Sequence, residues 1–297
     1  GNGTVEAACN PLVTNMYKNN QTTMLNRFHV WFPGGIFLGA LISQFMGKMD
    51  MGWQLQIAVM LIPLAIYAYL FMGQAFPGRE ESGQASVTEN LKGIFTPFYL
   101  FMILCMVLTA NTELSTQQWV ERLLGKAGAE PMLILAMVTG LMAVGRYFAG
   151  PVIHRLNPVG VLLASSIVAS IGIYMMSHAT GAMTYVSAIM FAIGVCYFWP
   201  TMLGFTSEHN PQSGALGLSL MGGAGMFATA MLQPVVGGWL DHSKVANAAE
   251  MGFKYEGDMN PDGIKAFLAS IPADSMQQLE LMAGQETLSN IVIFPVI

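Results

Sequence analysis

The sequence has few charged side chains. Only 10% of its 297 residues are Asp, Glu, Lys or Arg, whereas 54% are hydrophobic. Average proteins carry about 25% charged residues, so this composition excludes water as the main solvent of the fold. The sequence also lacks a P-loop, a Gly-rich nucleotide fingerprint, zinc-ligand spacing and a nucleophile elbow. We therefore expect a protein that is not an enzyme and that uses no cofactor and no metal.

Cysteine is also scarce. Cys9, Cys105 and Cys196 lie at wide spacing, each within an apolar segment. An odd number of cysteines at this spacing fits neither a disulfide framework nor a metal site. We interpret all three as small buried hydrophobic residues, and the 24 methionines as adaptable packing.

What the sequence has in abundance is long apolar runs, and the mean hydropathy is +0.51. Each run has about the 20 residues that a helix needs to cross a bilayer. Seven such runs lie at about 28–47, 53–73, 97–120, 131–149, 158–177, 182–205 and 213–240. The sequence therefore predicts an all-α protein that crosses the lipid bilayer several times.

Two hydrophilic connections divide the chain. We predict that residues 1–75 are the C-terminal part of an N-terminal helical bundle, that residues 76–95 are a central cytoplasmic linker, and that residues 96–297 are a C-terminal bundle. The second bundle includes a long acidic extracytoplasmic loop at 241–286, whose eight acidic and three basic residues account for the whole net charge of −5. No basic patch points to nucleic acid. The helices at both chain ends look cut off, so we expect a fragment of a longer protein.

Two acids stand in segments that are otherwise poor in charge. Glu6 shares a helical face with Gly3 and Asn10, and Glu113 lies near the end of the 97–120 run. A carboxylate at membrane depth is costly, and it normally faces a cavity or an ion pathway. We predict that both acids carry protons. The alternative is a structural acid that a neighbouring helix satisfies.

Polar and aromatic side chains in the same runs are candidates for binding a hydrophilic solute. A sugar presents hydroxyl groups and a C–H face, which amides, imidazoles and aromatic rings match. The predicted binding residues are Asn10, His29, Trp31, Gln117, Gln118, Trp119, Trp199 and Gln233. Three of them have a structural alternative: a helix-end position for His29, an interfacial belt for Trp119, and core or lipid-facing packing for Trp199.

The order of these motifs resembles one family of membrane proteins. Residues 1–11, with the pattern Gly-x-Gly-x-x-Glu-x-x-x-Asn-Pro, resemble the fourth helix of the fucose-permease-like branch of the major facilitator superfamily. Later segments resemble that family's fifth, seventh and tenth helices and the start of its twelfth. The resemblance implies a major-facilitator-type bundle, incomplete at both ends, that moves a sugar together with protons, with Glu6 as a coupling acid.

A short basic segment resembles the second copy of the family's cytoplasmic signature loop. It contains Arg146 and Arg155, and the resemblance implies that these residues gate the transporter. His154 stands where that signature often carries an acid. Anchoring by positive charge on the cytoplasmic side explains both arginines equally well.

Taken together, the sequence predicts a monomeric proton symporter for a small hydrophilic solute, most simply a monosaccharide. It would lie in the cell membrane, which is the inner membrane in a bacterium. Two alternatives remain open. The solute could be a non-sugar metabolite or a drug-like compound, or the protein could be a transporter-derived sensor that binds without translocation.

Overall fold

The computed structural model describes residues 2–75, 86–120 and 130–297, and these residues form helices and no strand. The first part of the chain contains α1 (Asn2–Met16), α2 (Gln21–Phe28), α3 (Trp31–Lys48), α4 (Trp53–Ala58), α5 (Leu61–Phe71), α6 (Val87–Ile94), α7 (Pro97–Ala110) and the π-helical turn η1 (Asn111–Ser115). The second part contains α9 (Pro131–Tyr147), α10 (Ala149–Met176), α11 (Met183–Val195), α12 (Phe198–His209), the 3-10 turn η2 (Pro211–Ser213), α13 (Gly214–Glu250), α14 (Pro261–Ala269), α15 (Ala273–Ile291) and α16 (Ile293–Val296).

The seven predicted apolar runs are all helical. Six helical stretches of the described chain are long and apolar enough to cross a membrane, and the seventh run corresponds to the shorter apolar helix Pro131–Tyr147. Several stretches contain breaks that the sequence predicts only in part. In α10, for example, Asn157 has φ 55° and ψ 165°, so the chain turns sharply before Pro158 and the apolar part of the helix. The fold is thus that of an all-α membrane protein.

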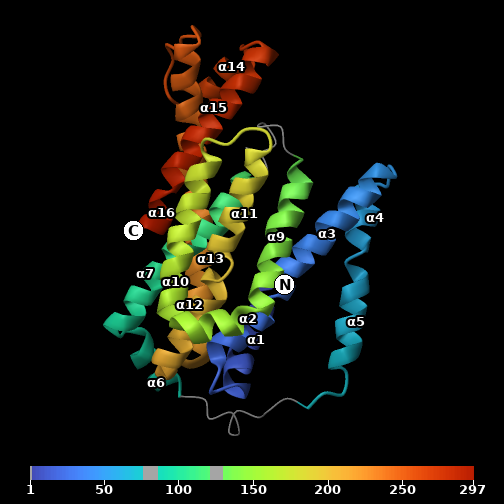
Figure 1. Cartoon of the computed structure of the whole chain (residues 1–297), viewed down its shortest axis with the longest axis vertical. Coiled ribbons are helices and arrows are strands. Elements are labelled where there is room, and N and C mark those ends of the chain that lie inside the picture. The colour runs from blue at the N-terminus through green and yellow to red at the C-terminus, as the bar shows by residue number, and fades with distance from the viewer. Residues whose placement is uncertain (1, 76–85, 121–129) are drawn as a thin grey trace.

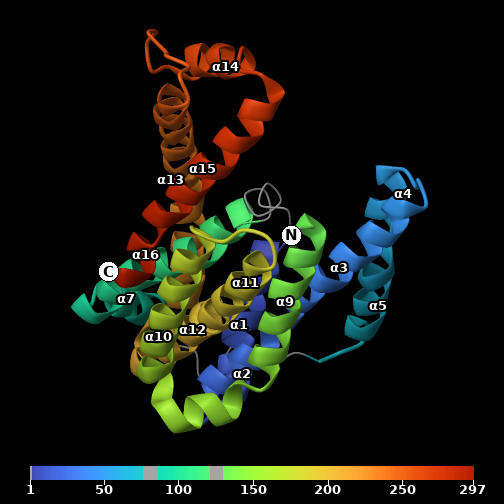
Figure 2. The same cartoon turned by 45° about the horizontal axis from the view of Figure 1, so that its top comes forward.

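The helices pack side by side, with the connections at two opposite ends (Figure 1). One end, which we call the α6 end, holds α6, the beginning of α10 and the end of α12. Helix α5 stands apart from the main group of helices in both views, whereas α4 contacts α3, where the Ser43 hydroxyl donates to Oε1 of Gln56 at 2.8 Å (Figure 2). Neither α4 nor α5 contains a buried residue. The apolar surface of α5 therefore remains available to lipid or to further helices.

Small residues let the central helices approach closely. A Cβ atom on Gly172 of α10 would lie 2.5 Å from the backbone nitrogen of Phe191 in α11. A Cβ atom on Gly194 would overlap the backbone of Ala169 in the same way. Close contact through small residues is typical of membrane helix pairs. It brings α10 and α11 together around a core that includes Ile173, Phe191 and Val195.

Two predicted connections contain helices. Residues 241–286 are not one long loop, because α13 continues to Glu250 and α14 and α15 follow. Beyond the end of the bundle that lies opposite the α6 end, this segment forms a hairpin around buried Ala248, Ile271 and Leu279 (Figure 2). Our prediction overlooked that the acidic residues alternate with apolar ones at helical spacing. Likewise α6 lies within the predicted linker 76–95, whose residues 76–85 are outside the described part.

Helix α6 begins with a capping box at the α6 end. The Ser86 hydroxyl accepts from the backbone of Glu89, while the Glu89 carboxylate accepts from the backbone of Ser86 at 2.7 Å. The N–H of Ser86, which donates to the carboxylate, together with the nearby Ser86 side chain, holds the pKa of Glu89 below its usual value. The helical part of the polar linker therefore begins at a defined N-cap residue, Ser86, shortly before the start of α7.

Candidate functional site

The π-helical turn η1 interrupts the span Pro97–Val120 at the residues that carry its acid. Asn111 donates to the carbonyl of Val107 at 2.7 Å, and the Ser115 hydroxyl donates to Oδ1 of Asn111 at 2.9 Å. π turns are rare and lie frequently at functional sites. Here the turn places the side chain of Glu113 inside the helix bundle, where it is 2% exposed.

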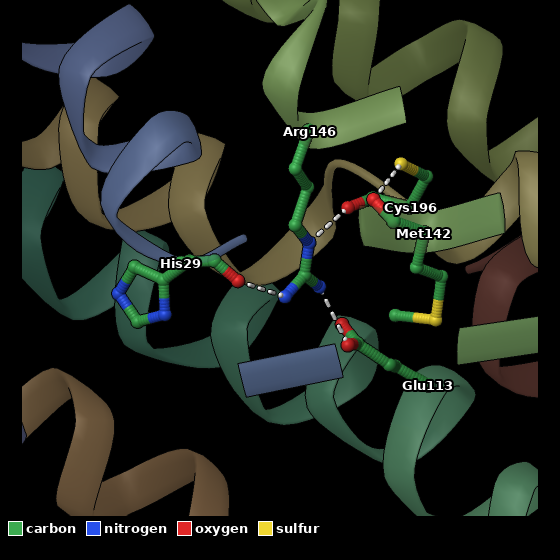
Figure 3. A network of polar contacts seen from close by, with 5 residues as sticks. All are labelled: His29, Glu113, Met142, Arg146 and Cys196. Atoms are coloured by element: carbon green, nitrogen blue, oxygen red, sulfur yellow. Dashed lines mark hydrogen bonds and ion pairs between the residues drawn. The ribbon is translucent and has the colours of Figure 1, made fainter. Parts of the chain in front are cut away.

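Glu113 forms a buried ion pair with Arg146 of α9. Nη2 of Arg146 lies 2.8 Å from Oε1 of Glu113, and the arginine side chain is 1% exposed (Figure 3). The second carboxylate oxygen, Oε2, is buried and forms no hydrogen bond of ordinary geometry with a described residue, although the backbone N–H of Trp199 at the start of α12 also interacts with this carboxylate. Burying two charges is costly, and leaving one of them without the other costs about 3–5 kcal/mol. The pair therefore holds the two helices in one register.

The remaining nitrogens of Arg146 donate to two backbone carbonyl groups. Nε donates to Cys196 at 2.7 Å, and Nη1 donates to His29 at 3.3 Å (Figure 3). The first acceptor has a simple origin in the sequence. Pro200 has no N–H group, so it cannot donate to the carbonyl of Cys196 four residues earlier. The break between α11 and α12 thus supplies an acceptor for the arginine.

His29 and Asn10 extend this network into the first part of the chain. Nε2 of His29 lies 3.0 Å from Oδ1 of Asn10, and both side chains are buried. Asn10 is on α1 together with Glu6, whose side chain is partly exposed. Glu6 also acts electrostatically on Glu113. The structure therefore brings together both predicted coupling acids, two predicted binding residues and one predicted gating residue.

A second group of predicted residues lies against α13. Nε1 of Trp119 donates to Oε1 of Gln233 at 2.8 Å, while Nε2 of Gln233 is buried without a partner in the described chain. Trp199 is buried, and Cβ atoms on Gly222 and Gly225 would lie 3.7 and 3.0 Å from its ring. Its Nε1 also lacks a partner among the described residues. The indole rings of Trp119 and Trp199 thus lie along α13, together with two N–H donors, Nε1 of Trp199 and Nε2 of Gln233, that have no partner among the described residues.

Other predicted residues lie away from this network. Trp31 is 77% exposed, and Gln118 and Arg155 are also exposed, while Gln117 is partly exposed. The predicted basic connection contains a turn at Phe148 and a sharp break at Asn157, but Arg146 itself precedes the turn. Helix α9 continues through Arg146 to Tyr147 and α10 starts at Ala149, so the arginine points into the bundle while Arg155 remains at the α6 end.

Two cavities border these helices without containing the ion pair. One, of about 530 Å³, lies at the α6 end and is lined by residues that include Lys18, His154 and Glu208. The other, of about 350 Å³, lies between α3, α4 and α9 and is lined by residues that include Gln44, Lys48 and Gln56. Glu113 lines neither cavity, and because its side chain is 2% exposed, the acid is closed off from its surroundings in this conformation.

Sequence reasoning missed the partners within this site. It treated Glu113 and Arg146 as members of separate motifs, although they form one ion pair. It also missed the carbonyl of Cys196. The available signal was Pro200, because a proline inside an apolar helix frees the carbonyl four residues before it.

Apolar helices of spanning length, packed around a buried ion pair, define a polytopic membrane protein. The family model described as Major Facilitator Superfamily matches residues 1–233. The chain therefore belongs to the major facilitator superfamily, whose members are secondary transporters that carry small solutes across a lipid bilayer. No curated protein and no solved structure matched the chain.

Proposed function

We propose that this chain carries a monosaccharide across the cell membrane together with a proton, by alternating access between a bundle of residues 1–75 and a bundle of residues 96–297. One observation carries the proposal: the carboxylate of Glu113 is buried inside the helix bundle, where Arg146 pairs with one of its oxygens at 2.8 Å. Intramembrane acids in such positions are characteristic of proton pathways.

The network can lose its ion pair without leaving the arginine unsatisfied. When Glu113 takes up a proton, its attraction to Arg146 weakens, but the guanidinium keeps the carbonyl groups of Cys196 and His29 as acceptors. In this proposal Glu6, which acts electrostatically on Glu113, would then balance the positive charge that remains on Arg146. Proton binding at one acid would therefore shift the arginine toward the other acid, and it would loosen the contact between α9 and η1.

The residues around this network suit a solute with several hydroxyl groups. The Asn10–His29 pair offers an amide and an imidazole, and the Trp119–Gln233 pair offers a ring and an amide. Nε1 of Trp199 and Nε2 of Gln233 are donors that still need acceptors within the described chain. Hydroxyl oxygens of a sugar would satisfy them, and the rings would cover its C–H face.

The remaining assignments are part of the same proposal. Gln117, Gln118 and Trp31 would contact the solute in a more open conformation, because all three have exposed surface in this one. Arg146 would gate the centre of the molecule and Arg155 its α6 end, which would face the cytoplasm. The transporter would act as a monomer, since the proposed pathway lies within one chain.

Transport assays with purified full-length protein in liposomes test this function. A panel of labelled hexoses, 6-deoxyhexoses and non-sugar metabolites would identify the solute, with exchange of the hexoses expected. Glu6→Gln should abolish uphill uptake driven by a proton gradient while counterflow exchange continues, because exchange needs no net proton movement. The exposed acid variant Glu256→Gln serves as control. Uphill uptake by Glu6→Gln would contradict the coupling role, and binding without any flux would indicate a sensor.

A further inference from the structure

Helices α2 and α12 meet at the α6 end, although they lie in different bundles of the proposed division. The contact is backbone to backbone: a Cβ atom on Gly204 of α12 would lie 2.5 Å from Cα of Thr22 in α2. Two hydrogen bonds cross it. Oε1 of Glu208 accepts from the backbone N–H of Thr22 at 2.9 Å, and Nδ2 of Asn26 donates to Oγ1 of Thr201 at 3.2 Å.

The bond from Glu208 caps a helix across the contact. Helix α2 starts at Gln21, and its own N-cap residue, Asn20, makes no side-chain capping bond. The first N–H groups of a helix need acceptors, and the helix dipole favours negative charge at this position. Glu208 provides both from the end of α12. The capping interaction exists only while the two helices touch.

The bond from Asn26 lies deeper in the same contact. Asn26 and Thr201 are each 0% exposed. Asn26 also donates to the carbonyl of Thr22, one turn earlier in α2. A buried amide needs such partners, so separating the helices would require water to replace Thr201. The contact between α2 and α12 thus has one buried hydrogen bond, Asn26–Thr201, and one hydrogen bond at its rim, Thr22–Glu208.

Charged groups face the rim from several elements. The cavity of about 530 Å³ beside the contact is lined by Lys18 from the α1–α2 connection, His154 from α10 and Glu208 from α12. Since the side chain of Glu208 is exposed, its capping bond is open to water on one side. Water can therefore replace this bond readily when the helices separate, as a reversible closure requires.

From these contacts we propose that Glu208 is a positioning residue of the transport cycle, which closes the α6 end by capping α2 from α12, with Asn26 and Thr201 as its buried support. The proposal rests on the proposed function, because it assigns the contact to one state of an alternating-access cycle. When α2 and α12 separate, the cap, the amide bond and the Gly204 contact are lost together, and the α6 end opens.

Thiol labelling of the full-length protein tests the closure without any solute or proton gradient. Thr23 is a suitable probe position, because it is 2% exposed, its hydroxyl has no partner in the described chain, and its methyl group lies 3.4 Å from where a Cβ on Gly150 of α10 would be. The probe is Thr23→Cys in a background in which Cys9, Cys105 and Cys196 are replaced by alanine. A water-soluble maleimide then reports opening of the α6 end.

Glu208→Ala should raise the labelling rate about threefold to fivefold, in line with the loss of one helix cap. Glu208→Gln keeps an acceptor but loses the charge, so a smaller increase is expected. Thr201→Val should also raise the rate. The control is Glu250→Ala, which removes an exposed acid from the far end of α13 and should leave labelling unchanged.

Folding of each variant is checked by its elution as a single species in detergent. Unchanged labelling in folded Glu208→Ala and Glu208→Gln would overturn the proposal that Glu208 closes the α6 end, whatever the transport assays show. Increased labelling in a protein that moves no solute would support the closure and contradict the proposed function. The two failures can therefore be told apart.

Discussion

Arg146 and Glu113 form an ion pair of 2.8 Å whose two side chains are almost completely buried. The first stability prediction concerns this pair. Arg146→Met leaves an uncompensated carboxylate inside the bundle, which should destabilise the protein by about 3–5 kcal/mol. The double variant Glu113→Gln/Arg146→Met removes both charges and should recover most of that loss. Thermal unfolding in detergent measures both. A double variant as unstable as Arg146→Met would show that the pairing does not matter.

The second prediction concerns the carbonyl that Pro200 leaves free. In Pro200→Ala the new N–H can donate to the carbonyl of Cys196, and it then competes with Nε of Arg146, which donates to that carbonyl at 2.7 Å. A hydrogen bond to a charged group contributes about 1.5–3 kcal/mol, so we expect counterflow exchange to slow about tenfold or more. Pro131→Ala, in the first turn of α9, is the matched control. Equal exchange rates in Pro200→Ala and Pro131→Ala would refute the idea that the free carbonyl of Cys196 positions Arg146.

The third prediction concerns the contact between α10 and α11. Gly194→Ala places a methyl group against the backbone of Ala169 and should cost roughly 1–3 kcal/mol through overpacking. Gly223→Ala is the control, because a Cβ atom there meets nothing within 4 Å. Alanine is the better helix former, so the control should be neutral or slightly stabilising. Apparent melting temperatures distinguish the two, and a similar shift in both would argue against close packing at Gly194.

The helical fold could be predicted from the sequence because a bilayer imposes length and apolarity on each span. The runs that contain Phe191 or Ile173 satisfy both conditions, and they are helical in the structure. The hairpin over 241–291 could not be predicted in the same way. From residue 241 onward its residues lie outside the seven apolar runs, and their helices depend on a small core that includes Ile271 and Leu279, which composition alone conceals.

The candidate site could be predicted only as separate residues. Glu113, Arg146 and His29 stand out because polar groups are costly in apolar segments. Their pairing depends on the π turn at Asn111–Ser115 and on the angle between α2 and α9, and neither follows from local sequence. The exposed position of Trp31 is a further example, since its place in an apolar run is compatible with either face of the helix.

The most direct test of the account measures proton movement by Glu113→Gln. Full-length protein in liposomes is given the sugar that exchanges in the panel, and a pH electrode follows the weakly buffered medium. The wild type should make the medium more alkaline as sugar enters. Glu113→Gln should exchange sugar without any change in pH, because the amide cannot take up the proton. Proton uptake by this variant at the wild-type rate would contradict the claim that Glu113 carries the proton.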